Sequence, residues 1–151
     1  MITIILRHRR ENLRKCSLSG LETRSDLAFY TYPVDPLPDL TGYLVLKVGA
    51  PPLTEKDSPH GLLLIDGTWN LAQRMNNQLP PNLEARSLPP GYRTAYPRRQ
   101  TGCPDATEGL SSIEALYLAH LLLNRSTEGL LDRYHWKEEF LTLNKLSSLA
   151  V

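Results

Sequence analysis

Residues 62–75, with the sequence LLLIDGTWNLAQRM, constrain the fold more than any other part of the chain. An apolar run ends at Asp66, and apolar side chains then recur at three-residue steps from Trp69 to Met75. A short run that is apolar throughout is typical of a strand buried on both faces, and three-residue steps are helical spacing. The stretch therefore predicts a buried strand over 62–65 and a helix over 68–78, with an acid at their junction.

The rest of the chain predicts an α/β fold. Apolar runs rich in β-branched or aromatic residues indicate strands over 2–6, 27–32 and 43–48, and a brief strand over 86–88. Helices are expected over 110–123, which is apolar almost all round and therefore central, and over 127–146, which is amphipathic. Residues 7–24 are polar and basic and indicate a loop, while 89–108 lack periodicity. Strands that alternate first with loops and then with helices predict a largely parallel sheet.

The composition limits the class of protein. A chain of 151 residues fits one domain, here expected as two lobes over 1–57 and 61–151 that form one compact unit. Two distant cysteines, Cys16 and Cys103, indicate free thiols, and the N-terminus does not resemble a signal peptide, so a cytoplasmic location is expected. No window approaches the ~20 apolar residues of a membrane span. The four histidines lack metal-ligand spacing, so no metal is expected, and His120 is interpreted as a satisfied core residue.

Asp66 stands where a parallel sheet would bind a ligand. In open α/β sheets, ligands bind beyond the carboxyl ends of the strands. Gly67 permits a tight turn, Thr68 can cap the helix with its hydroxyl, and Trp69 offers a flat apolar surface. The same residues also fit a plain helix start with a core tryptophan, and the spacing by itself favours that simpler interpretation.

Three short blocks resemble known families. Asp66-Gly67-Thr68-Trp69 resembles the signature of the DTW-domain family, in which Asp-x-Thr-Trp follows an apolar strand and precedes a helix. Residues 110–115, LSSIEA, are similar to the Leu-Ser-Thr-x-Glu-Ala block of the same family. Residues 15–20, KCSLSG, resemble the Arg/Lys-Cys-Ser-Gly-like segment of the small-subunit ribosomal-RNA aminocarboxypropyltransferases. The chain lacks the cysteine cluster of many DTW proteins, and its residues 87–109 differ from the ribosomal group, so the resemblance is to the superfamily.

The resemblance implies a fold and a reaction. The fold would be SPOUT-like, with a parallel sheet, flanking helices and a C-terminal trefoil knot, and with a small N-terminal α/β lobe. The reaction would move the 3-amino-3-carboxypropyl group of S-adenosylmethionine to a uridine or pseudouridine in ribosomal or transfer RNA. Two alternatives remain open: an RNA methyltransferase on the same fold, and a non-catalytic module that binds RNA or the ribosome.

The resemblance also implies site residues. Asp66 would be the catalytic residue that accepts a proton from the base, or a ligand of the cofactor, and both roles remain open. Ser111 and Glu114 have the spacing of a capping box, so Glu114 is expected to steady a helix end rather than to react. The implied cofactor-binding residues are Ser17, Asp66, Thr68, Trp69, Leu110, Ser111 and Ser112.

Two basic segments are candidates for RNA binding. Residues 7–24 carry six basic and two acidic side chains, and residues 86–99 carry four arginines beside Tyr92 and Tyr96 without an acid. Arginine pairs phosphates and tyrosine can stack on a base, although solvated surface charge is the ordinary alternative. The sequence does not determine the oligomeric state. The predicted RNA-binding residues are Arg7, Arg9, Arg10, Arg14, Lys15, Arg93, Arg98 and Arg99.

Overall fold

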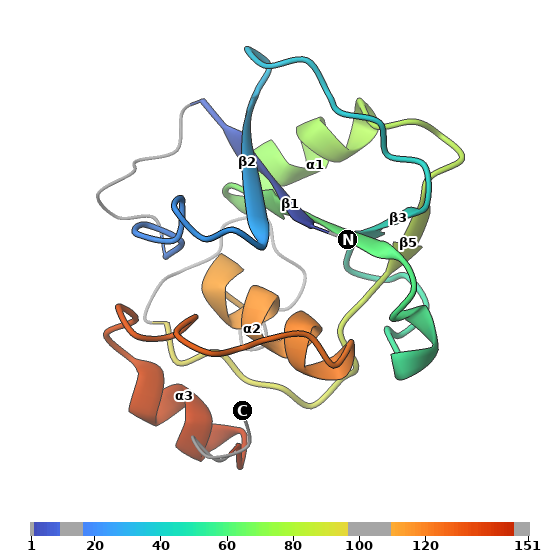
Figure 1. Ribbon diagram of the computed structural model, residues 1–151. Coiled ribbons are helices and arrows are strands. Elements are labelled where there is room, and N and C mark those ends of the chain that lie inside the picture. Colours follow the sequence, from blue (N-terminus) through green and yellow to red (C-terminus); the bar gives the residue numbers. More distant parts are fainter. Residues whose placement is uncertain (1, 10–16, 97–109, 147–151) are drawn as a thin grey trace.

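The computed structural model describes residues 2–9, 17–96 and 110–146. Within these ranges the strands and helices follow one another as in a mixed α/β protein (Figure 1). The strands are β1 (Thr3–His8), β2 (Leu27–Tyr32), β3 (Tyr43–Leu46), β4 (Gly61–Asp66) and β5 (Glu84–Arg86). The helices are the 3₁₀ turn η1 (Glu55–Asp57) and the α-helices α1 (Trp69–Asn77), α2 (Ser112–Leu122) and α3 (Lys137–Leu143).

The five strands form one sheet in the order β2-β1-β4-β3-β5, and every described pair is parallel. This confirms the predicted parallel sheet. The central strand β4 is apolar up to Asp66, because neighbouring strands and both covering layers bury it. Parallel strands end at the same edge, so the carboxyl ends of β1 and β4 lie side by side, with Arg7 opposite Asp66.

Helices cover both faces of the sheet. Figure 1 shows α1 on one side and α2 with α3 on the other. The α1 side contains Leu6 and Met75 in one buried cluster, and the α2 side contains Ile5, Leu116 and Phe140 in another. Neighbouring residues of β1 thus point to opposite faces, which explains why its apolar run does not alternate with polar residues.

Strands from both predicted lobes share this sheet. β1 lies between β2 and β4, so the segments 1–57 and 61–151 are interleaved rather than packed as separate sheets. The boundary between the two lobes and the trefoil knot stay predictions. In the described part of the chain, no helix has the length and apolar character needed to cross a membrane.

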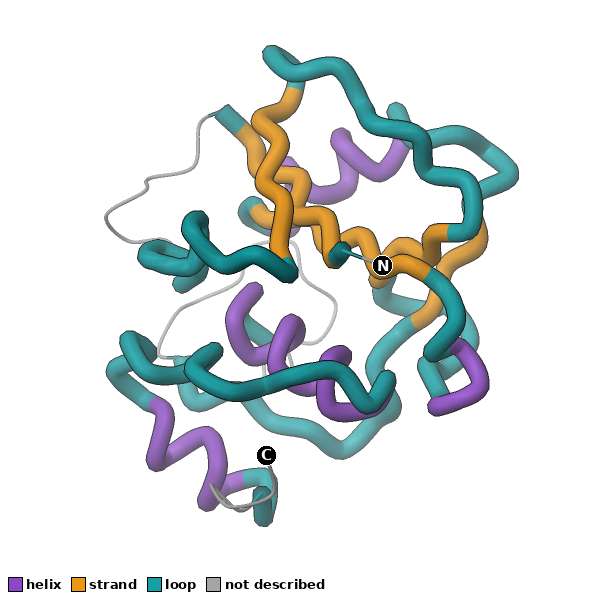
Figure 2. Tube along the Cα trace, viewed as in Figure 1, coloured by secondary structure: helices purple, strands orange, loops and turns teal. Residues whose placement is uncertain are grey.

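The predicted helix over 127–146 is wrong in its first half. Helix α3 begins only at Lys137, and Figure 2 shows the segment between α2 and α3 as loop. Gly129 has φ +76°, a left-handed conformation that an α-helix does not accommodate. Successive turns then direct Leu130, Leu131 and Tyr134 into the core, so burial is achieved without a helix.

The other elements lie close to their predicted positions. The helices predicted over 68–78 and 110–123 and the strand over 27–32 are confirmed with small shifts at the ends. The strand over 43–48 ends early, at Leu46, and the strand over 86–88 begins two residues earlier, at Glu84. The loop expected from residue 7 is wrong for Arg7 and His8, because both continue β1 in register with β2.

Candidate functional site

Asp66 is buried at the carboxyl end of β4, with 3% of its surface exposed. The Nε–H of Arg7 donates to its Oδ2 at 3.2 Å, and the hydroxyl of Ser112 donates to its Oδ1 at 2.7 Å. Arg7 comes from the neighbouring strand, and Ser112 begins α2. A strand and a helix N-terminus therefore hold one carboxylate oxygen each, and the partial positive charge of the helix end adds to this stabilisation.

Arg7 connects Asp66 to a second carboxylate. Its Nη1 lies 3.2 Å from Oε2 of Glu22, and its guanidinium carbon lies 4.7 Å from the centroid of the Phe29 ring. We expected Arg7 in a basic loop that binds RNA, but it lies in β1 and is 7% exposed. Burial raises the pKa of Glu22, yet backbone N–H groups and Arg7 lower it by more, so the net shift is downward.

The turn that contains Ser17 and Gly20 has hydrogen bonds both to the N-terminus of α2 and to Glu22. The backbone N–H of Ile113 donates to Ser17 Oγ at 3.1 Å, which places Ser17 at the N-terminus of α2. At the other end of the turn, the N–H of Gly20 donates to Glu22 Oε1 at 2.7 Å. The fold thus brings together Ser17, Asp66 and Ser112, three of the residues that the resemblance implied.

Glu114 is fully buried and joins three segments of the chain. The N–H of Ser111 and the hydroxyl of Thr94 donate to its Oε1 at 2.8 and 2.6 Å. The N–H of Ala95 and the hydroxyl of Tyr134 donate to its Oε2 at 2.8 and 2.9 Å. The Glu114 half of the predicted capping box is present, and the same carboxylate also holds the backbone of Ala95. Burial, followed by the charge of Glu114, raises the pKa of the Tyr134 hydroxyl.

The turn after Asp66 starts α1 as predicted. Thr68 is the N-cap, and its Oγ1 accepts the N–H of Leu71 at 3.5 Å. Trp69 is the first residue of the helix, and its side chain lies outside the described part of the structure. Leu110 is half-buried against the core on the α2 side, next to Ser111.

The predicted RNA-binding residues divide into three groups. Arg9 and Arg93 are exposed, and the main chain of Arg93 is held by Asn144, which accepts its N–H at 2.7 Å and donates to its C=O at 2.9 Å. Arg7 is buried, as described above. Tyr96 was expected to stack on a base. Its ring lies parallel to that of Tyr134, with 6.5 Å between the two ring centroids. Outside the described residues lie Arg10, Arg14, Lys15, Arg98 and Arg99.

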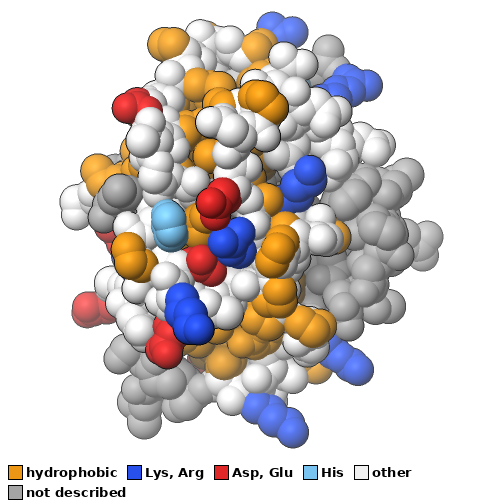
Figure 3. All heavy atoms as spheres, turned by 90° about the vertical axis from the view of Figure 1, so that its right-hand side faces the viewer, with side chains coloured by type: hydrophobic (Ala, Val, Ile, Leu, Met, Phe, Trp, Pro, Cys, Tyr) orange, Lys and Arg blue, Asp and Glu red, His pale blue; other side chains and the backbone are white. Residues whose placement is uncertain are grey.

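The β3–β5 side of the molecule carries charges of both signs. Arg86 of β5 pairs with Asp57 at 3.4 Å and with Glu84 at 3.1 Å. Figure 3 shows this side, where among the coloured side chains acidic and basic groups lie next to each other beside a histidine. This side therefore does not present a uniform positive patch to a phosphate backbone.

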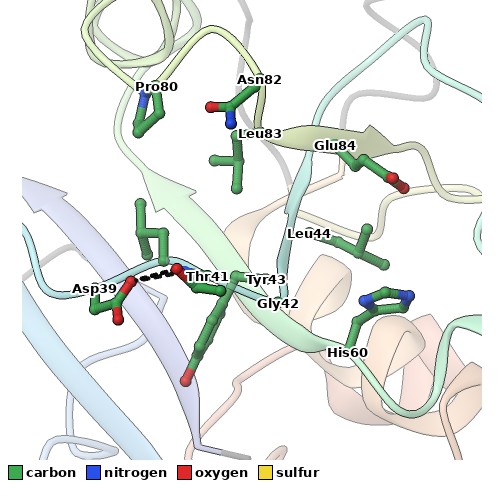
Figure 4. A pocket seen from close by; sticks show the side chains of 11 residues that line it. Asp39, Thr41, Gly42, Tyr43, Leu44, His60, Pro80, Asn82, Leu83 and Glu84 are labelled. Atoms are coloured by element: carbon green, nitrogen blue, oxygen red, sulfur yellow. Dashed lines mark hydrogen bonds between the residues drawn. The ribbon is translucent and has the colours of Figure 1, made fainter.

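A pocket of about 340 Å³ lies at the opposite edge of the sheet from Asp66. It is formed at the amino ends of β3, β4 and β5, and Figure 4 shows Asp39, Tyr43, His60 and Glu84 among its lining residues. Asp39 points to the hydroxyl of Thr41, which donates to it at 2.7 Å. None of the residues implied for the cofactor lines this pocket, so it is not part of the candidate site.

His120 is a satisfied core residue, as predicted. Its Nδ1 lies 3.0 Å from the C=O of Ser126, and its Nε2 lies 2.8 Å from Thr3 Oγ1. Since a carbonyl only accepts, Nδ1 carries the hydrogen and Nε2 accepts from the threonine hydroxyl. Burial lowers the pKa of His120. Among the described residues, no group of three His, Cys, Asp or Glu side chains has the arrangement of a metal site.

Sequence reasoning missed the pairing of Arg7 with Asp66, the part played by Glu22 and the wider role of Glu114. The pairing of Arg7 with Asp66 depends on β1 lying next to β4, and strand neighbours 59 positions apart leave no local signal. Glu114 carried a local signal for its cap alone. The partners Thr94 and Tyr134 belong to loops, which have no periodicity to reveal them.

The comparisons with known proteins identify a shared fold. No family model matches the chain, and no protein with a curated description matches it. Among solved structures, the chain is similar to the SAM-dependent rRNA:acp-transferase Tsr3 from Vulcanisaeta distributa, with a TM-score of 0.69 and 24% sequence identity. The alignment covers 96% of this chain and 80% of that one. The parallel five-stranded α/β architecture is thus that of a Tsr3-like fold.

Proposed function

We propose that the chain is an S-adenosylmethionine-dependent RNA aminocarboxypropyltransferase with a SPOUT-like trefoil knot. The observation that carries the proposal is the buried, oriented carboxylate of Asp66 at the carboxyl edge of β4. That edge is where parallel α/β sheets bind ligands. The similar fold of Tsr3, which its description names an SAM-dependent rRNA:acp-transferase, supports the cofactor and the reaction class.

The side chains around Asp66 fit a cationic nucleoside. S-adenosylmethionine carries positive charges on its sulfonium and its ammonium group, and the described part of the site contains the carboxylates of Asp66 and Glu22 together with the guanidinium of Arg7. The groups that would hold the cofactor are Asp66, Thr68, Trp69 and the main chain of residues 110–112, with Ser17 beside them. These groups lie on two helix starts and one strand end, which are rigid supports.

When bound, the cofactor supplies electrophilic carbons attached to its sulfonium. The contribution of the protein is to aim one of these carbons at the nucleophilic nitrogen of the base, at roughly 3–3.5 Å. Asp66 would do this by holding the cofactor, or would accept the proton of the base. Both roles use an acceptor whose orientation is set in advance, which avoids reorganisation during the reaction.

RNA would approach from the side where exposed arginines border the site. Arg9 follows β1 directly, two residues after Arg7, and Arg93 belongs to the segment that Glu114 and Asn144 secure. Both side chains are exposed. Phosphate contacts of this kind should make the affinity for RNA fall with increasing salt.

Calorimetric titration of the full chain tests the proposal. We expect S-adenosylmethionine to bind, methylthioadenosine to be retained better than S-adenosylhomocysteine, and Asp66→Asn to weaken binding by about tenfold or more. Asp132→Asn, which changes an exposed carboxylate, is the matched control. Mass spectrometry of RNA incubated with the protein then identifies the transferred group. A preference for S-adenosylhomocysteine and a methylated product would mean methyl transfer, and absence of binding would favour the non-catalytic module.

A further inference from the structure

Arg133 is a cation near the candidate site that the sequence patterns did not single out. It belongs to the segment between α2 and α3, and its side chain is exposed. The acid next to it in the chain, Asp132, pairs with Lys137 instead, with 3.8 Å between Oδ1 and Nζ. An exposed guanidinium of this kind can bind the oxygens of a phosphate through two parallel N–H bonds.

The side chain of Arg133 lies on Gly20. A Cβ atom at Gly20 would lie 2.7 Å from both Cδ and Nη1 of Arg133, which is closer than such atoms pack. Gly20 also has φ +94°, a left-handed conformation that glycine adopts without strain. Glycine at position 20 therefore lets the arginine lie directly on the turn, and a larger residue would push it away.

This contact places Arg133 close to the N-terminus of α2. The turn under the arginine also contains Ser17, whose Oγ accepts the N–H of Ile113 at 3.1 Å. At the same helix end, the hydroxyl of Ser112 donates to Asp66 at 2.7 Å. The guanidinium of Arg133 therefore lies at the margin of the candidate site, separated from the start of α2 by one turn of the chain.

A second set of contacts fixes the main chain of Arg133 relative to the same helix. The next residue, Tyr134, is buried, and its hydroxyl donates to Oε2 of Glu114 at 2.9 Å. The other oxygen of Glu114 accepts the N–H of Ser111, the residue before α2, at 2.8 Å. One carboxylate thus joins the segment that carries Arg133 to the start of α2, so the position of the arginine is set by the fold.

We infer that Arg133 is an RNA-binding residue, which Gly20 holds at the margin of the candidate site to contact a phosphate of the substrate. The inference rests on the proposed function, because it takes RNA as the substrate. A nucleotide whose base reaches Asp66 has a phosphate on either side, and these phosphates pass the margin of the site. Contacts of this kind set the position of a nucleic acid without reading its sequence.

Fluorescence anisotropy of the full chain with a fluorescein-labelled RNA hairpin, with uridine in its loop, tests the contact. One phosphate contact to a single strand contributes about 0.7 to the slope of log affinity against log salt, or about fivefold in affinity at roughly 0.1 M salt. Arg133→Ala should therefore weaken RNA binding about fivefold and reduce the slope by about 0.7, whereas Arg133→Lys keeps the charge and should keep the slope.

Lys56→Ala is the matched control, because it removes an exposed cation from η1. Figure 1 shows η1 near the C-terminal end of α2, where Arg125 donates to the C=O of Ser58. This variant should change neither the affinity nor the slope. Calorimetric titration with S-adenosylmethionine should give the same affinity for the wild type and Arg133→Ala, because the arginine contacts RNA rather than the cofactor.

Gly20→Ala tests how the arginine is positioned. The added Cβ should displace Arg133, so RNA binding should weaken about as much as in Arg133→Ala. When Arg133 is already alanine, Gly20→Ala should cause little further loss, because no arginine remains to be displaced. A purely structural role of Gly20 would instead weaken RNA binding by the same factor in both backgrounds, and would overturn its assigned role.

Three results would overturn the role of Arg133. These are an unchanged affinity and slope in Arg133→Ala, an equal loss in Lys56→Ala, and weaker binding of S-adenosylmethionine in Arg133→Ala without an effect on RNA. A wild-type chain that binds neither S-adenosylmethionine nor RNA would refute the proposed function itself. A wild-type chain that binds both, with no effect of Arg133→Ala on either, would refute only the inference.

Discussion

Replacing Glu114 by glutamine should destabilise the protein although the side chain keeps its size. In the wild type, two donors point at each oxygen of this fully buried carboxylate, and each pair consists of one backbone N–H and one hydroxyl. An amide offers one oxygen and one NH₂ group. Whichever way the amide is oriented, one backbone N–H, that of Ser111 or that of Ala95, faces an NH₂ group and loses its acceptor.

The size of the effect follows from this geometry. A buried N–H without an acceptor costs about 1–3 kcal/mol, and the remaining bonds lose the strengthening that a charged acceptor provides. The hydroxyls of Thr94 and Tyr134 can rotate and accept a hydrogen bond from the NH₂ group, which limits the loss. We expect Glu114→Gln to lower the free energy of unfolding by about 2–4 kcal/mol, or the Tm by roughly 5–15 °C for a chain of this size.

Urea unfolding followed by tryptophan fluorescence measures this change. Glu138→Gln is the matched control, since it removes a carboxylate that is exposed on α3. Tyr134→Phe should lose about 1 kcal/mol, because it removes one donor and leaves the carboxylate three others. A Glu114→Gln variant that unfolds within about 0.5 kcal/mol of the wild type, with the same dependence on urea, would refute the interpretation of Glu114 as a junction of three segments.

Three other predictions concern separate parts of the molecule. Burial lowers the pKa of His120 in the folded state, so the unfolded chain binds a proton at this residue more readily than the folded chain does. The free energy of unfolding should therefore fall as pH decreases below about 6.5, by at most about 1.4 kcal/mol per pH unit. Urea unfolding at pH 7.5 and 5.5 checks this, and His120→Gln should remove that part of the slope. Arg7→Met should lower the free energy of unfolding by about 3–5 kcal/mol because it removes the guanidinium that pairs with the buried carboxylate of Asp66, and adding Asp66→Asn should recover at least half of the loss. Equal stability of the single and double variants in urea would contradict the ion pair. Arg93→Ala should weaken RNA binding and reduce the slope of log affinity against log salt by about one, measured by fluorescence anisotropy with a labelled RNA, whereas an unchanged slope would remove Arg93 from the RNA surface.

Local signals explain where the sequence predicted the structure well. The junction at Asp66 was predicted because a buried strand, a tight turn and an N-cap are all encoded within a few neighbouring residues. The capping box of α2 was predicted for the same reason. The helix expected over 127–146 failed in its first half, because its amphipathic pattern there also fits a series of turns, and the left-handed conformation of Gly129 favours the turns.

The sequence by itself determined the elements of the fold and marked the candidate site, since apolar periodicity, caps and turns act over one or two helical turns. It thereby predicted the parallel α/β class, the strand that ends at Asp66 and the central helix α2. Only the tertiary structure decided what surrounds Asp66, because the order β2-β1-β4 places Arg7 beside it and the packing of α2 brings Ser112 to its other oxygen. These contacts join residues 46 and 59 positions apart, and the register and packing that create them arise from the whole core.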